Sequence, residues 1–151
     1  MLKESDLSLS DYQALAAFRY QIRRFLHFSE AAVKAEGLEP QQHQMLLAIR
    51  ALDLPTVGAL AAHLLIRHHS AVGLLDRLAG RRLVERLRGD PDHRQVQVRL
   101  TSDGEEKLRR LSAGHRAELR NSGPMLVAAL GALLEKLSPI TEEENVAGKR
   151  N

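Results

Sequence analysis

The sequence predicts a mainly α-helical chain that carries one β-hairpin. Apolar residues recur at helical spacing through most of the chain, and residues that cap or break helices divide this pattern into segments. One stretch, 95–100, alternates polar and apolar residues as a half-buried strand does. With 151 residues, of which 44% are hydrophobic and 27% charged, the chain has the size and composition of one globular domain.

A long first helix is expected from Ser8 to about Ala35. Ser8 can cap its N-terminus with Asp11 bonding back, and Gly37 is a typical C-terminal stop. Its apolar residues form two stripes that together cover about half of the circumference. Because a helix this apolar needs partners on two sides, we expect a second subunit. The stripes are Leu15, Ile22, Leu26 and Val33, and Phe18, Phe25, Phe28 and Ala32.

Three short helices are expected next. Pro40 can open the first and Thr56 can cap the second, while Val72, Leu75 and Leu78 make the apolar face of the third. The second and third are joined by a tight turn, and arginines lie on the polar side of the third. This is the layout of a helix-turn-helix. The expected ranges are 40–52, 57–64 and 68 or 69–81.

A β-hairpin, or wing, is predicted to follow. Its strands are 83–87 and 95–100, the residues between them are rich in turn formers, and Arg88, His93 and Arg94 lie at its tip. Thr101 can cap a long helix that Asn121 to Pro124 interrupts, and a last apolar helix runs from 125 to 137. The predicted fold is a winged helix-turn-helix with about six helices and a two- or three-stranded wing.

The positive charge is concentrated between Arg67 and Arg99. This block holds eight arginines and four acids, a net charge of +4, whereas the rest of the chain carries −1. The planar guanidinium of arginine suits phosphate and guanine edges, which suggests a nucleic-acid partner. A merely solvated charged face is the alternative, and the structure that the block adopts decides between the two.

Other classes of function find little support. The chain has no cysteine, which excludes disulfides and thiolate chemistry and makes a reducing cytoplasm the expected compartment. We expect no membrane span, secretory signal, cofactor, metal site or catalytic residues, because no motif for them is present. No two of the seven histidines have the i, i+4 spacing of helical metal ligands, and His115 is expected to be a hydrogen-bonded core or interface residue.

The ordered motifs between 57 and 104 resemble the MarR family of bacterial transcription regulators. They cover roughly 50 residues, a third of the chain. The resemblance implies a single chain, 1–151, with dimerisation helices at 8–36 and 102–138 and a DNA-binding lobe at 40–100. It also implies a homodimer whose recognition helices enter successive major grooves. The motifs are Leu60-Ala61, Asp76-Arg77-Leu78, Leu83-Val84-Glu85-Arg86, Asp92-His93-Arg94 and Leu100-Thr101-Ser102-Asp103-Gly104.

The same resemblance implies which residues contact DNA. At the wing, Arg94 is expected in the minor groove, held by a salt bridge from Asp92, with Arg88 beside them. His68 and His69 could instead only cap the helix. Arg81 and Arg82 would contact backbone phosphate or nothing. On the recognition helix the implied contacts are Arg67, His68, His69, Ser70, Gly73 and Arg77.

Two positions depart from the family pattern. Leu65, in the turn of the helix pair, and Arg82, after the recognition helix, stand where glycine is usual. Such sites commonly need a positive φ, which strains a non-glycine residue by roughly 1 kcal/mol. We therefore expect that the turn geometry, and with it the tilt of the recognition helix, could deviate without a change of fold.

The predicted function is a homodimeric repressor at pseudo-palindromic operators. Its signal is a small molecule, a metal or none, and the resemblance to the family implies a small aromatic or phenolic effector. Residues of the first, second and fifth helices would bind that effector, with His27, Phe28, His43 and Arg116 as candidates, although ordinary surface and interface roles are an alternative for them. The alternative function is a winged-helix module whose basic block binds an acidic protein instead of DNA.

Overall fold

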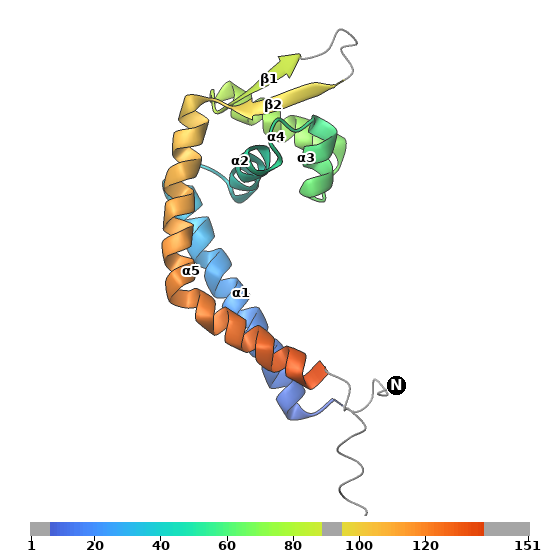
Figure 1. The fold of residues 1–151 in the computed structure, drawn as a ribbon, viewed down its shortest axis with the longest axis vertical. Helices are drawn as coiled ribbons and strands as arrows, with labels where there is room; N and C mark the ends of the chain where they lie inside the picture. The colour runs from blue at the N-terminus through green and yellow to red at the C-terminus, as the bar shows by residue number, and fades with distance from the viewer. Residues whose placement is uncertain (1–6, 89–94, 138–151) are drawn as a thin grey trace, which may run out of the picture. The chain divides into compact units, whose positions relative to one another are not determined.

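The computed structural model describes residues 7–88 and 95–137 of the chain. These residues form five helices and one antiparallel pair of strands (Figure 1). The mainly helical fold with a hairpin therefore agrees with the prediction. The elements are α1 (Leu9–Ala35), α2 (Pro40–Leu52), α3 (Val57–His63), α4 (His68–Gly80), β1 (Val84–Arg88), β2 (Val96–Leu100) and α5 (Ser102–Leu137).

The predicted helix caps are present. At the start of α1 the backbone N–H of Ser8 donates to Asp11 Oδ2 at 2.7 Å, and the Asp11 N–H donates to Ser8 Oγ at 3.3 Å. Thr56 Oγ1 accepts from the N–H of Ala59 at 3.1 Å, and Thr101 Oγ1 accepts from the N–H of Gly104 at 3.1 Å. Because these bonds satisfy N–H groups that the first turn leaves free, each of the three helices starts within one residue of its predicted position.

The predicted interruption of the last helix is wrong. α5 continues through Pro124, so the described residues contain five helices instead of about six. A proline inside a helix removes one backbone hydrogen bond and crowds the preceding turn, at a cost of roughly 3 kcal/mol. Helical order on both sides outweighs this local cost here, and Ser122 Oγ adds a hydrogen bond to the Glu118 carbonyl at 3.0 Å within the same turns.

The chain folds as two compact units, and the larger one comprises His27–Ala117. Its core is built from α2, α3, α4, the hairpin and the adjoining turns of α1 and α5. Leu75 and Leu78 of α4 are buried as predicted, whereas Val72 is only half-buried and Ala71 and Leu74 complete the inner face. Other fully buried side chains of this core are Val33, Met45, Leu46, Leu60 and Val98.

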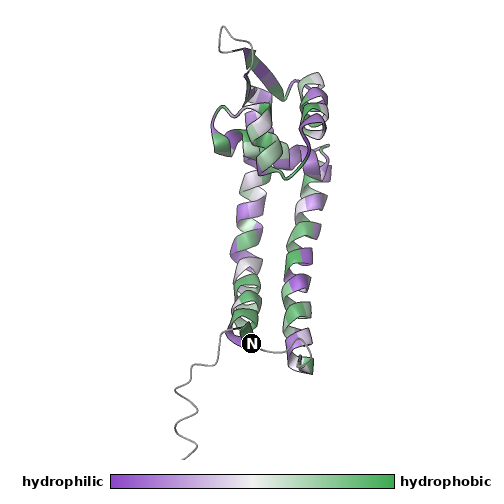
Figure 2. Cartoon of the chain, turned by 90° about the vertical axis from the view of Figure 1, so that its right-hand side faces the viewer, coloured by the Kyte–Doolittle hydropathy of each residue, from purple (hydrophilic) through white to green (hydrophobic). Residues whose placement is uncertain are grey.

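The second unit combines the described residues of α1 up to Leu26 with those of α5 from Glu118 onward. Its helix ends are tied by Lys136, whose Nζ donates to Ser10 Oγ at 2.6 Å. Leu133 is its one buried hydrophobic residue within the part of the chain that the structure describes. Hydrophobic segments recur along both helices (Figure 2), and many of these side chains are exposed. Examples are Leu9, Tyr12, Leu15, Tyr20 and Leu26 of α1 and Leu119, Met125 and Val127 of α5.

Candidate nucleic-acid interface

The buried side of α4 determines which of its residues face outward. Ala71, Leu74, Leu75 and Leu78 hold the helix against the core. Arg67 is the N-cap, with extended backbone angles (φ −72°, ψ 153°), and its carbonyl accepts from the Ala71 N–H at 3.1 Å. The side opposite the core is left to solvent over the length of the helix.

Three of the candidate residues of α4 lie on this outer side. His69, Gly73 and Arg77 fall within about 80° of helix rotation, one above the other. Arg77 lies over Gly73, since a Cβ added to that glycine would be 3.7 Å from Arg77 Nη1. That is ordinary contact distance, so packing within the described chain does not demand a glycine here. Arg67, His68, His69, Ser70 and Arg77 are exposed and Gly73 is half-exposed.

Both departures from the glycine pattern are accommodated by positive φ angles, as expected for these sites. Leu65 has φ 56° and Arg82 has φ 58°. Each follows a helix and closes it with two hydrogen bonds, one from its own N–H and one from the N–H of the next residue. Gly37 (φ 74°) and Leu38 form the same pair of bonds at the end of α1. The turn geometry is thus retained with strained side chains in glycine positions. The bonds are Leu65 N to Ala62 O, Ile66 N to Ala61 O, Arg82 N to Ala79 O and Leu83 N to Leu78 O, at 3.0–3.2 Å.

The described part of the wing ends at Arg88, which is exposed and pairs in register with Val96. The hairpin is fixed to the loop before α3, because the Val98 N–H donates to the Pro55 carbonyl at 2.9 Å. Asp92, His93 and Arg94 lie outside the described residues. The salt bridge of Asp92 and the minor-groove role of Arg94 therefore remain predictions.

Several arginines of the basic block are engaged within the protein. Arg86 on β1 pairs with Asp76 on α4 at 2.7 Å, and Arg99 pairs with Glu85 across the hairpin at 2.5 Å. Arg81 Nη1 donates to the Gly37 carbonyl at 2.6 Å, so this arginine caps the end of α1. Within 7–88 and 95–137, four arginine side chains of the block form no hydrogen bond or ion pair. They are Arg67, Arg77, Arg82 and Arg88.

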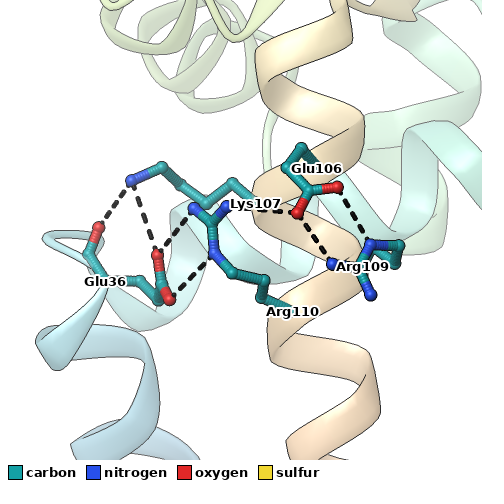
Figure 3. Close-up of polar contacts among 5 residues, drawn as sticks. All are labelled: Glu36, Glu106, Lys107, Arg109 and Arg110. Carbon is teal, nitrogen blue, oxygen red and sulfur yellow. Dashed lines mark hydrogen bonds and ion pairs between the residues drawn. The ribbon is translucent and has the colours of Figure 1, made fainter.

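A second charged cluster joins the end of α1 to α5 (Figure 3). Arg110 holds both carboxylate oxygens of Glu36 at 3.1 and 3.2 Å, and Lys107 Nζ donates to the Glu36 carbonyl at 2.8 Å. The hydrogen bond from Arg110 lowers the pKa of Glu36, and the hydrogen bond from Arg109 lowers the pKa of Glu106 to about 2. These ion pairs fasten the end of α1 to α5, and the three cations and two carboxylates leave the cluster with a net charge of +1.

Three rings from α1, α2 and α5 meet at His115, which is buried and hydrogen-bonded as predicted. Its Nδ1 donates to the Leu111 carbonyl at 2.6 Å, so in the neutral ring Nε2 accepts from the Ser29 hydroxyl at 2.6 Å. His43 stacks on it with ring centroids 5.0 Å apart, and Phe28 meets it edge-on at 6.1 Å. Burial, with a smaller effect of His115, lowers the pKa of His43.

The four effector candidates are therefore only partly brought together. Phe28 and His43 both contact His115, whereas the side chains of His27 and Arg116 are exposed. A cavity of about 630 Å³ lies elsewhere in the same unit and is lined by none of the four. Its charged residues pair with one another: Arg50 lies 3.7 Å from Glu105, and Arg109 lies 2.7 Å from Glu106.

No group of three or more potential metal-ligating side chains occurs among the residues that the structure describes. None of the described helices is both long and apolar enough to cross a bilayer.

Comparisons with known proteins place this geometry in context. The structure of a MarR family protein from Bacillus stearothermophilus is 20% identical, covers 96% of this chain and 92% of its own, and has a TM-score of 0.67. A mutant MarR from E. coli complexed with operator DNA is 24% identical, with coverage of 89% and 100% and a TM-score of 0.63. A MepR mutant from S. aureus bound to an oligodeoxyribonucleotide is 19% identical, with coverage of 95% and 92% and a TM-score of 0.60.

At these identities the structural likeness establishes the winged-helix fold. A search of the curated proteins finds no match. Residues 36–95, which run from the end of α1 to the start of β2, match the MarR family. Residues 36–95 are therefore similar to the MarR family, while the likeness over the rest of the chain is one of fold.

Proposed function

We propose that this protein is a transcription regulator that binds double-stranded DNA as a homodimer and represses transcription at pseudo-palindromic operators. The observation that carries the proposal is the outer side of α4, where Arg67 and Arg77 form no ion pair with the described residues and flank the half-exposed Gly73. The family match, and the operator DNA bound to the similar E. coli structure, support it. MarR-family proteins are regulators and not enzymes.

In this proposal α4 enters the major groove. Residues at the N-terminus of a recognition helix reach base edges, which assigns base or phosphate contacts to Arg67, His68, His69 and Ser70. Gly73 allows the helix backbone to approach the DNA, and Arg77 pairs with a phosphate or a guanine. Arg88 leads into the wing, where Arg94, oriented by Asp92, would enter the minor groove.

The dimer in this proposal forms through segments 8–36 and 102–138, and 40–100 is the DNA-binding lobe. The exposed Tyr12, Leu15 and Leu26 of α1 and Met125 and Val127 of α5 support this assignment, because so much exposed apolar surface is unusual for a monomer. Two-fold symmetry predicts half-sites about 10 bp apart. Sedimentation equilibrium would test the dimer, and a monomer that still binds DNA would contradict it.

We propose a small aromatic or phenolic acid as the effector, bound by His27, Phe28, His43 and Arg116. The half-buried rings of Phe28 and His43 offer apolar contact, and the exposed Arg116 offers a cation for the carboxylate. Calorimetric titration with 2-hydroxybenzoate should give binding that Arg116→Ala weakens. Equal affinities of the wild-type protein and Arg116→Ala for 2-hydroxybenzoate would show that Arg116 is not part of the effector site.

The experiment that tests DNA binding is selection of bound duplexes from a random pool, followed by gel-shift titration of the selected operator. Arg77→Ala should weaken binding by about 1–3 kcal/mol. It should also reduce the slope of log K against log salt concentration by about one unit. Arg50→Ala removes the same charge from α2, where the arginine faces Glu105, and serves as the matched control. Equal losses in both variants would indicate nonspecific attraction and contradict the proposed interface.

The alternative, a module that binds an acidic protein, leads to a different result in this experiment. Random duplexes would then yield no enriched sequence, and sheared DNA would compete poorly for the protein. Wild-type protein that enriches a palindromic sequence would exclude this alternative.

A further inference from the structure

Leu65 is the most exposed large hydrophobic residue of the described chain, with 93% of its surface accessible. In the same unit, the other exposed large hydrophobic residues have accessible fractions of no more than 47%. Leu65 also adopts a φ of 56°, which glycine adopts without strain. Both its exposure and its backbone conformation are unfavourable for the isolated chain.

The position of Leu65 is as informative as its exposure. The hydrogen bond from the Ile66 N–H to the Ala61 carbonyl closes the turn in which Leu65 lies, two residues before the α4 N-cap Arg67. Leu65 is therefore continuous with the exposed residues at the N-terminus of α4. This end of α4 is the one that the proposed function directs at base edges.

A leucine in a cationic surface cannot bond to phosphate, so its favourable contact with DNA must be apolar. The apolar group that a duplex displays in the major groove is the C5-methyl of thymine. We propose that Leu65 determines sequence specificity by packing against a thymine methyl group in each half-site. This inference rests on the proposed DNA-binding function and adds to it a base preference at one operator position.

The test uses the selected operator and its variants with uracil in place of thymine, which lack only the methyl group. Wild-type protein should lose about threefold to fivefold in affinity for each half-site in which uracil replaces the contacted thymine, and about tenfold to twentyfold when both are replaced, as expected for one buried methyl per half-site. Leu65→Gly should bind the thymine operator about tenfold to twentyfold more weakly and should not distinguish uracil from thymine there. Leu65→Met should retain the preference for thymine.

Unfolding in urea separates this contact from loss of structure. Leu65→Gly relieves the backbone strain, so its unfolding midpoint should rise while its affinity for the operator falls. Wild-type affinity in Leu65→Gly, or uracil effects that are the same in both proteins, would overturn the proposed contact while leaving DNA binding intact. Wild-type protein that selects no operator would overturn the proposed function, and with it this inference.

Discussion

Gly104 lies where the backbone of α5 comes closest to the start of the hairpin. A Cβ added to this glycine would be 2.1 Å from the carbonyl oxygen of Leu83 and 3.0 Å from its carbonyl carbon. Ordinary contact begins at 3.4 Å, so the two backbones would have to separate by about 1.3 Å. The Leu83 carbonyl is held in place because it accepts from the Thr101 N–H at 3.0 Å, and Thr101 Oγ1 donates to the Arg82 carbonyl at 2.7 Å.

Gly104→Ala should therefore destabilise the protein by about 2–4 kcal/mol. Overpacking against backbone accounts for about 1–3 kcal/mol, and weakening of a hydrogen bond adds about 1 kcal/mol. Gly114→Ala is the matched control, because it lies in the same helix with no atom within 4 Å of the added Cβ. The control should gain about 0.5–1 kcal/mol from helix propensity.

Urea unfolding followed by circular dichroism, at one fixed protein concentration, measures both changes. The fixed concentration matters because the stability of the proposed dimer would depend on it. An unchanged midpoint for Gly104→Ala, or a shift of both variants in the same direction, would refute the steric reasoning.

Further predictions concern backbone strain, pH and the wing. Arg82→Gly should stabilise the protein by about 1 kcal/mol and Gly37→Ala should destabilise it by a similar amount, because both residues have positive φ. Urea midpoints that shift in the same direction in both variants would contradict this. Folding lowers the pKa of His43 below 6.5, so the unfolded chain binds the proton first as the pH falls. The free energy of unfolding should therefore decrease as the pH falls below about 6.5. His43→Phe should make this decrease smaller in urea unfolding experiments at a series of pH values. The lowered pKa of Glu36 stabilises the fold above pH 4.5, and this contribution is lost as the pH falls further. In the same experiments, Glu36→Gln should therefore reduce the loss of unfolding free energy below pH 4.5. Asp76→Ala should cost less than about 1 kcal/mol in stability, because its ion pair is partly exposed, yet should weaken operator binding in a gel shift by releasing β1 from α4.

Local signals in the sequence predicted most of the fold. The caps at Ser8, Thr56 and Thr101 act within four residues, so they set the helix starts without help from the rest of the chain. Pro124 is equally local, but its effect was overridden by the helical structure on either side of it. A local rule therefore failed where its cost was smaller than what the surrounding helix contributes.

The candidate interface was predictable in outline, and its electrostatics were not. Spacing along α4 placed His69, Gly73 and Arg77 on one side. The sequence could not indicate that Arg81 bonds to a carbonyl 44 residues away, or that Arg86 pairs with Asp76, because these partners meet only through the tertiary fold. The free arginines therefore had to be identified from the structure.

The ion pair of Asp76 with Arg86 has a mechanical consequence. It fastens the recognition helix to the first strand, and the bond from Val98 to Pro55 fastens the second strand to the loop before α3. The ion pair and this hydrogen bond thus hold helix and hairpin together within one lobe. If the protein is the homodimer proposed above, a signal that weakens DNA binding would act by changing the separation of the two lobes, and not the shape of either one.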